Sequence, residues 1–199
     1  MESSPIEHLI NEISKLPGLG RRSSQRIALY LLKNKNNSLI PLIKTLEESN
    51  KKIIECSLCG NVDMISPCNI CSNNKRDQVS ICIVEDISDL WTFERIGFYK
   101  GLYHVLGGSL SAINGIGIEE LTINKLIRRI KDKNIKEVIL ALSTTMEGQT
   151  TSHVIADKLE KLQELTVTRL AQGIPIGGEV HYLDENTLNT AFQSRKKIT

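Results

Sequence analysis

The sequence has no apolar run long enough to cross a membrane, which excludes a protein anchored by a membrane-spanning helix. Its first ten residues include Glu2 and Glu7 and lack the apolar stretch of a signal peptide. No segment of the chain repeats another. We therefore expect a cytoplasmic protein whose 199 residues, 40% of them hydrophobic, form one or two cooperative units.

A large net charge is also missing. The formal charge is only +2, so the overall balance does not by itself indicate a nucleic-acid partner. The charges are, however, unevenly placed. Residues 15–44 contain no acidic residue and carry a series of cations: Lys15, Arg21, Arg22, Arg26, Lys33, Lys35 and Lys44. This stretch predicts a basic surface on a nearly neutral protein.

The spacing of apolar residues predicts an α/β fold. Up to about residue 54 the apolar residues recur at helical spacing. From residue 79 onward, strand-like segments at 79–84, 102–106, 137–142 and 165–170 alternate with expected helices at 87–96, 119–133 and 150–163. Such alternation is typical of a mainly parallel sheet with flanking helices. We predict a helical hairpin domain at 1–54, a small zinc finger at 55–78, the sheet domain at 79–174 and a short C-terminal extension at 175–199 with a strand and a basic helical tail.

Two Cys-x-x-Cys pairs lie in the segment with too few apolar residues to form its own core. Cys56 and Cys59 precede Cys68 and Cys71 by a loop of eight residues. This spacing allows four thiolates to surround one metal ion, and it predicts a closed, structural zinc site that replaces the missing core. Two disulfides are disfavoured in a reducing cytosol, and a redox Cys-x-x-Cys would not need the second pair. The fifth cysteine, Cys82, lies in an apolar strand and is interpreted as a buried small residue.

A glycine-containing turn separates the first two predicted helices. Gly18 and Gly20 permit a tight turn, and the backbone amides that open the second helix can meet a phosphate. The pattern is similar to a helix-hairpin-helix motif, which contacts the backbone of DNA without recognising its bases. We predict that the DNA-binding residues are Gly18, Gly20, Arg21, Arg22 and Arg26. The alternative is an ordinary helix connection with a solvated basic face.

Acidic residues follow two of the predicted strands. Glu85 and Asp86 end the first strand, and Glu147 lies just after the third. The layout resembles a Toprim domain, whose catalytic members add an Asp-x-Asp pair after the third strand to hold magnesium. Ser143 and Thr145 occupy that region here, so we expect no catalysis. The alternative is a phosphoryl-transfer enzyme that works with Glu85 and Glu147, since one or two carboxylates can hold Mg²⁺ when a substrate phosphate helps.

The order of these segments carries a resemblance over essentially the whole chain. The hairpin, the four-cysteine segment and the degenerate Toprim layout are followed by Thr-Arg-Leu-Ala-Gln-Gly-Ile-Pro-Ile-Gly-Gly-Glu at 168–179. Leu-Gly-Gly-Ser-Leu-Ser at 106–111 and Asn-Gly-Ile-Gly at 114–117 add to it. The chain resembles the RecR family of recombination mediators.

The resemblance implies a role in recombinational DNA repair. Members of the family work with RecO, and in some systems RecF, to help load RecA onto single-stranded DNA. It also implies a homo-oligomeric ring, a dimer or tetramer, that surrounds double- or single-stranded DNA with the hairpin arginines inside. The acidic patch Glu85, Asp86 and Glu147 would then be the RecO-binding surface. A zinc-organised protein-interaction module without DNA affinity is the remaining alternative.

The segment Val180–Glu185 resembles the Walker B strand of nucleotide hydrolases, with its acidic pair. Such an enzyme also needs a Gly-rich loop with Lys and Ser or Thr to hold the phosphates, and the sequence contains none. We therefore expect an edge strand and a turn in this segment.

Overall fold

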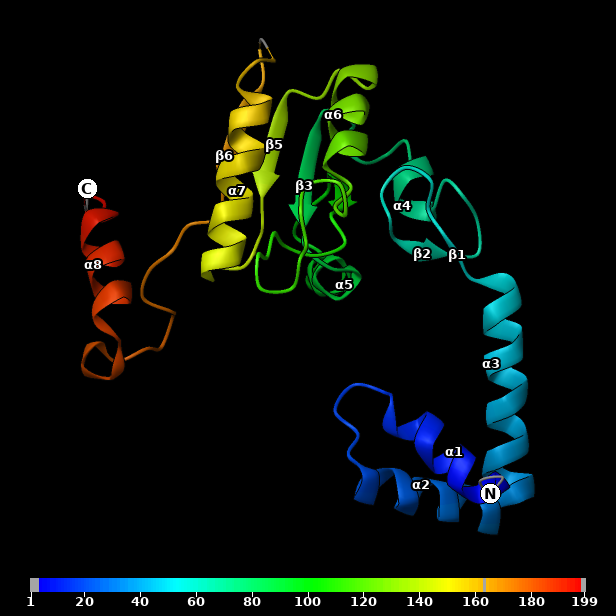
Figure 1. Cartoon of the computed structure of the whole chain (residues 1–199). Helices are drawn as coiled ribbons and strands as arrows, with labels where there is room; N and C mark the ends of the chain where they lie inside the picture. The colour runs from blue at the N-terminus through cyan, green and yellow to red at the C-terminus, as the bar shows by residue number, and fades with distance from the viewer. Residues whose placement is uncertain (1–3, 163, 198–199) are drawn as a thin grey trace. The chain divides into compact units, whose positions relative to one another are not determined.

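The computed structural model describes residues 4–162 and 164–197 (Figure 1). The chain forms two compact units, which divide between Ile53 and Ile54, one residue before the expected end of the helical region. None of the helices in the described ranges is both long and apolar enough to cross a membrane. The helices and strands below confirm the predicted α/β class.

The described part of the N-terminal unit, residues 4–53, consists of helices joined by short connections. Its elements are α1 (Pro5–Ser14), α2 (Arg21–Lys33), the short π-helix η1 (Lys35–Leu39) and α3 (Ile40–Lys52). Helices α1 and α2 pack through Ile10, Ala28 and Leu31, which are all buried. In α3, all of which is described, no residue is buried, and Leu46 is 59% exposed. In the described part of this unit, the buried residues therefore all lie in α1 and α2.

The second unit is built on a parallel sheet of four strands in the order β4-β3-β5-β6. Its elements are β3 (Ser80–Val84), α5 (Ile87–Ile96), β4 (Leu102–Val105), α6 (Ile123–Asp132), β5 (Glu137–Leu140), α7 (Met146–Leu159) and β6 (Thr166–Arg169). Each predicted strand of this region forms, and the helices occupy the crossover connections (Figure 1).

Side chains of the central strand β3 alternate between the two faces of the sheet, as the pleat requires. Ile81 and Ile83 join the core cluster formed with α6 and α7. Cys82 and Val84 join the smaller cluster on the side of α5. All four residues are buried, which explains why the strand reads as a continuous apolar run.

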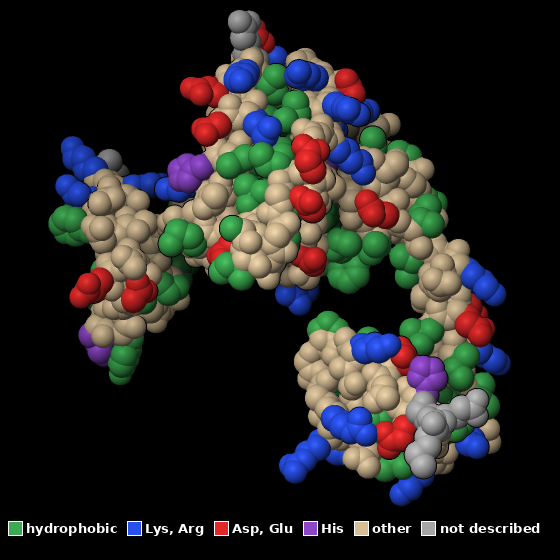
Figure 2. Space-filling model, in the orientation of Figure 1, with side chains coloured by type: hydrophobic (Ala, Val, Ile, Leu, Met, Phe, Trp, Pro, Cys, Tyr) green, Lys and Arg blue, Asp and Glu red, His purple; other side chains and the backbone are tan. Residues whose placement is uncertain are grey.

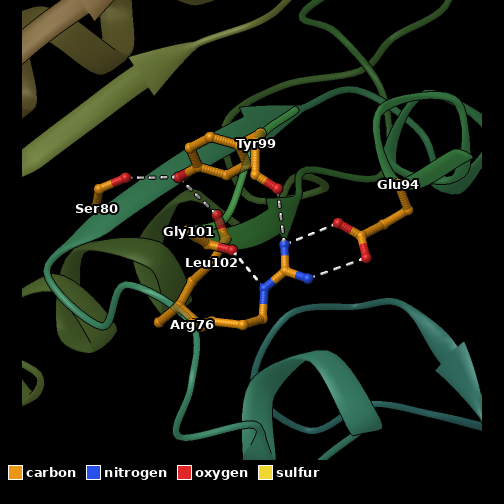
Figure 3. Close-up of polar contacts among 6 residues, drawn as sticks. All are labelled: Arg76, Ser80, Glu94, Tyr99, Gly101 and Leu102. Atoms are coloured by element: carbon orange, nitrogen blue, oxygen red, sulfur yellow. Dashed lines mark hydrogen bonds and ion pairs between the residues drawn. The ribbon is translucent and has the colours of Figure 1, made fainter. Parts of the chain in front are cut away.

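The four-cysteine segment lies against β4, an edge strand of this sheet. Its elements are β1 (Ile54–Glu55), β2 (Val62–Asp63) and α4 (Asn69–Ser72). The amide of Val105 in β4 donates to the carbonyl of Cys59 at 2.8 Å. At the other end of the strand, Arg76 Nε donates to the carbonyl of Gly101 at 2.8 Å (Figure 3). The finger therefore covers hydrogen-bonding groups that the sheet leaves free along its edge.

Two helices differ from the expected bounds. Helix α7 begins four residues before the predicted 150, because the Thr145 side chain accepts a hydrogen bond from the Gly148 amide and so caps an earlier turn. It ends at Leu159; Gln163, the predicted end, lies outside the described residues. Helix α6 is shorter than the predicted 119–133 and covers only Ile123–Asp132.

The Walker-B-like strand at Val180–Glu185 was a wrong prediction. Residues Val180–Tyr182 form the 3₁₀-helix η2, and α8 (Glu185–Gln193) follows. The acidic pair begins this helix instead of ending a strand: Asp184 accepts hydrogen bonds from the amide and hydroxyl of Thr187, at 3.0 and 2.6 Å. An Asp at the N-cap, with Glu185 in the first turn, is a stronger local signal than the apolar residues before it.

Candidate functional site

The four cysteines of the two Cys-x-x-Cys pairs come together in space. Their Sγ atoms all lie within 4.8 Å of one another, and those of Cys59 and Cys68 are 3.6 Å apart. In a tetrahedral thiolate site with metal–sulfur bonds of about 2.3 Å, neighbouring sulfurs are about 3.8 Å apart. Within residues 4–162 and 164–197, no other group of three or more His, Cys, Asp or Glu side chains meets so closely. The cluster therefore fits one metal ion held by four sulfurs.

Local backbone structure presents the sulfurs. Gly60 follows the first pair with φ +77°, and a Cβ there would lie 3.3 Å from Val105 of β4, so a tight turn against the sheet favours glycine. The second pair is organised by α4, which begins just after Cys68 and contains Cys71. Both pairs are thus fixed by short turns that the sequence spacing already specifies.

Backbone amides point at two of the sulfurs. The amide of Cys68 donates to Cys56 Sγ at 3.3 Å, and that of Asn61 donates to Cys59 Sγ at 3.4 Å. Hydrogen bonds from the Cys59 and Cys71 thiols lower the pKa of Cys68, and the same contact with Cys68 raises the pKa of Cys59. Without a metal ion the negative charge therefore gathers on Cys68, and a metal that binds all four sulfurs must displace the protons of the others.

One residue beside the cluster escaped the sequence analysis. Arg129 of α6 lies 58 positions along the chain from Cys71, and its Nη2 donates to Cys71 Sγ at 3.4 Å. Its Nη1 donates to the carbonyl of Tyr103 in β4. A signal was present in the sequence, because Arg129 follows the core residue Leu126 by three positions on the apolar face of an amphipathic helix.

The predicted hairpin turn joins α1 and α2. Gly18 has φ +76°, a conformation that a side chain would strain, and the amide of Leu19 donates to the carbonyl of Leu16. Gly20 is the N-cap of α2, and no side chain in the described part of the chain caps that helix end. The amides of its first turn remain available to an anion.

The three predicted arginines differ in their surroundings. Arg21 is bound to α1, through Glu7 Oε2 at 2.7 Å and Asn11 Oδ1 at 3.2 Å. Arg22 and Arg26 are exposed and, within the described residues, form no ion pair. Lys and Arg side chains stand out from the surface of this helical unit (Figure 2). Of the three predicted arginines, Arg22 and Arg26 are therefore the two that are free of acidic partners in the described part of the chain.

A shallow hollow of about 610 Å³ lies along α2. It is lined by cations, a hydroxyl group and apolar side chains: Ser23, Arg26, Ile27, Leu29, Tyr30 and Lys33. Tyr30, which is 59% exposed, follows Arg26 by four positions and precedes Lys33 by three, so the three side chains share one face of α2. The lining of this hollow therefore combines cations with an exposed aromatic ring and apolar side chains.

The predicted acidic patch is partly taken up by local structure. Glu85 Oε1 accepts a hydrogen bond from the Ser143 amide at 2.7 Å and lies next to Gly148 in α7. Asp86 caps α5, where its Oδ1 accepts from the Ser88 amide at 2.9 Å. Glu147, in the first turn of α7, is exposed. Glu147 is therefore the freest carboxylate of the three.

The place of the missing Asp-x-Asp pair is occupied by hydroxyl groups that start a helix. Ser143 Oγ and Thr145 Oγ1 are 2.8 Å apart, and Thr145 caps α7. Neither residue offers a carboxylate, and the nearby Glu85 carboxylate is held by the Ser143 backbone. The arrangement is suited to fixing the turn after β5.

Comparison with known proteins assigns most of the chain. Residues 6–49 match the family described as "RecR, helix-hairpin-helix", residues 80–171 match "Toprim domain", and residues 173–196 match "RecR, C-terminal". The protein "Recombination protein RecR" of Erythrobacter litoralis is 46% identical over 198 residues and is covered in full, as is this chain.

Two further relatives carry the same description. That of Rhizobium meliloti is 50% identical over 193 residues, 97% of this chain and 96% of the relative. That of Anaplasma marginale is 50% identical over 194 residues, 98% of this chain and 99% of the relative. With such identity over nearly its whole length, this chain belongs to the RecR family of recombination proteins.

Proposed function

We propose that this protein is a DNA-binding mediator and clamp of recombinational repair in the bacterial cytoplasm, with no chemistry of its own. It binds double- and single-stranded DNA through phosphate contacts, without sequence preference, and acts with RecO, and possibly RecF, to help load RecA. The observation that carries the DNA-binding part is the pair Arg22 and Arg26, exposed and without an acidic partner in the described residues, beside the uncapped start of α2.

A reversal of these two charges tests the proposal. In the variant Arg22→Glu/Arg26→Glu, affinity for duplex and single-stranded DNA should fall about equally for all sequences. The slope of log affinity against log salt should become shallower by about 2, since each lost phosphate contact removes about 0.9 of a released counterion. Fluorescence anisotropy across a salt series measures both quantities.

The matched control is Lys131→Glu/Lys133→Glu, which makes the same charge change at two exposed residues near the end of α6. It should bind DNA like the parent. If the hairpin variant also binds like the parent across the salt series, the hairpin is not the DNA-binding surface.

The metal in this proposal is one structural Zn²⁺ held by Cys56, Cys59, Cys68 and Cys71. Zinc suits a site of four sulfurs without oxygen ligands, and with all four positions filled it leaves no place for a reactive water. The ion would stabilise the fold of the finger. Mass spectrometry under native conditions should find about one zinc per chain.

The absence of catalysis rests on the turn after β5. Serine and threonine hydroxyls replace the paired aspartates, and Glu85 is engaged by the Ser143 amide. Magnesium would therefore find only single carboxylates here, and no pair of aspartates. Magnesium-dependent DNA cleavage by the purified protein that is lost in Glu147→Lys would overturn this part of the proposal.

We place RecO at the acidic patch of Glu85, Asp86 and Glu147, where Glu147 is the accessible member. Complementary charges favour fast, oriented docking of a basic partner surface. Glu147→Lys should therefore weaken binding of purified RecO, most clearly at low ionic strength, and leave the metal content and DNA affinity unchanged. Glu160→Lys, an exposed residue at the other end of α7, is the control. Undiminished affinity in Glu147→Lys would reject this docking site.

The clamp also requires self-association into a ring, a dimer or tetramer. Sedimentation of the purified protein with and without DNA tests this requirement. A monomer under both conditions, at concentrations where DNA is bound, would reject the clamp.

A further inference from the structure

Two arginines of the second unit are largely buried, and they differ in what balances their charge. The side chain of Arg76 is 12% exposed. Its guanidinium forms a two-pronged ion pair with the carboxylate of Glu94, at 2.8 and 3.0 Å (Figure 3). Removing a charge from water is strongly unfavourable unless an opposite charge and hydrogen bonds replace the water. Arg76 has both.

Arg129 is even less exposed, at 6%, and within the described residues it forms no ion pair with a carboxylate. Its partners are the carbonyl of Tyr103 and the sulfur of Cys71, while its Nε has no hydrogen-bond partner among the residues that the structure describes. A neutral carbonyl and a neutral thiol would leave a buried cation without a counter-charge. The structure therefore requires negative charge close to Arg129.

The neighbouring histidine does not supply it. His104 is fully buried in β4, and burial, together with the positive charge of Arg129, lowers the pKa of its imidazole to about 3. Its Nε2 lies 3.0 Å from the hydroxyl of Thr122. A neutral imidazole next to Arg129 avoids a second cation but does not balance the first.

The four-cysteine cluster can supply the missing charge. Four thiolates around one divalent ion carry a net charge of −2, and Cys71 is the ligand that Arg129 touches. We infer that Arg129 is the counter-ion of the metal–thiolate cluster: it offsets part of the negative charge and fixes Cys71, the least buried of the four cysteines. This inference rests on the proposed zinc site.

The position of Arg129 also gives metal binding an effect beyond the finger. The same guanidinium joins α6, the β4 carbonyl of Tyr103 and the ligand Cys71. Loss of the metal removes the charge that balances Arg129, within a helix that packs against the main core cluster. Metal loss should therefore weaken the sheet as well as the finger.

The test compares Arg129→Met and Arg128→Met in the full-length, zinc-loaded protein. Arg128 is the adjacent residue of α6 and is exposed. Transfer of zinc to an excess of a chromophoric chelator gives the release rate. Loss of a residue that supports a metal ligand typically changes metal affinity about 10–100-fold. We expect release to be faster by about that factor in Arg129→Met and unchanged in Arg128→Met.

The variant Arg129→Lys keeps the positive charge. It provides a second test if Arg129→Met does not fold. It should release zinc at a rate between those of the parent and the methionine variant. With Co²⁺ in place of zinc, the sulfur-to-cobalt absorption band should shift in Arg129→Lys, since the charge beside Cys71 has moved; a purely structural arginine would leave the band where it is.

The outcomes separate this inference from the zinc proposal. Parental zinc release in both Arg129 variants, with an unchanged cobalt spectrum, would overturn the role of Arg129 alone. A parent protein that contains no zinc and binds none would overturn the zinc proposal, and this inference with it.

Discussion

The helical hairpin unit and the sheet unit differ in how many residues they bury and in which kinds of residue these are. In the described part of the N-terminal unit, only four residues are buried: Ile10, Ser24, Ala28 and Leu31. The sheet unit buries two apolar clusters, a histidine and an arginine. The hairpin therefore carries its cations on the surface over a small core, whereas the sheet unit buries Arg129, where a charge interacts more strongly with its neighbours. Substitutions in each unit, compared with control substitutions, should show how this difference in burial affects stability.

Loss of a metal ligand should have the largest effect. Cys56→Ser is expected to lose the metal and unfold the finger, since structural zinc in small domains contributes on the order of 10 kcal/mol. Helicity of the hairpin unit should persist. Metal analysis and thermal unfolding followed by circular dichroism measure both results.

Cys82→Ser is the control, because Cys82 is a buried thiol outside the cluster, and burial raises its pKa to about 12. It should keep the metal. If Cys56→Ser retains one zinc per chain and is as stable as the parent, the four-cysteine cluster does not stabilise the fold of the finger.

Removal of one leucine from each unit should show the contrast in packing. Leu126 is fully buried in α6, and its replacement by alanine should lower the free energy of unfolding by about 3 kcal/mol. Leu46→Ala in α3 should cost less than about 0.5 kcal/mol, since that side chain is 59% exposed. Urea unfolding measures both. Equal losses would mean that the exposed face of α3 is covered in the protein in solution.

In the hairpin, backbone conformation should matter more than packing. Gly18→Ala places a side chain at φ +76° and should cost about 1–2 kcal/mol, although nothing lies within 4 Å of the added methyl group. Gly20→Ala is the matched control, because its φ of −83° suits any residue and the space is equally open. Similar melting temperatures for the two variants would show that the turn is not strained.

The smallest expected effect is a pH dependence confined to the sheet unit. The His104 pKa is about 3 in the folded protein and about 6.5 in the unfolded chain. As the pH falls, the unfolded chain therefore binds a proton at a higher pH than the folded protein does. The free energy of unfolding falls between about pH 6.5 and 3 as a result. We expect a loss of about 1 kcal/mol between pH 6.5 and 5.5.

His104→Gln should flatten this dependence, and His153→Gln, at an exposed position of α7, should not. Unfolding in urea at each pH provides the measurement. A dependence that persists unchanged in His104→Gln would assign it to other groups.

Features encoded by local spacing could be predicted from the sequence. The cysteine cluster depends on two short turns, and the alternation of strands with helices fixes a parallel sheet, so both followed from the order of residues. The strand and turn predicted at Val180–Glu185 were wrong: Val180–Tyr182 form a 3₁₀-helix, and capping by Asp184 begins a helix after a short apolar run. Here two hydrogen bonds from Thr187 to the Asp184 side chain mark the start of the helix.

Contacts between distant segments could not be predicted in this way. Arg129 reaches Cys71 only after α6 has packed beside β4, and the pairing of Arg21 with Glu7 depends on how α1 crosses α2. The sequence marks Arg129 as unusual, since it is a charge on an apolar helix face. Its partner is known only from the three-dimensional structure.

The edge of the sheet at β4 is covered by side chains and backbone groups of other segments. Groups along β4 are taken by Arg76 at Gly101, Arg129 at Tyr103 and Cys59 at Val105. An uncovered edge strand is a template on which other chains can add strands. If the finger unfolds without its metal, the groups held by Arg76 and Cys59 become exposed, and we expect the metal-free protein to aggregate more readily than the zinc-loaded one.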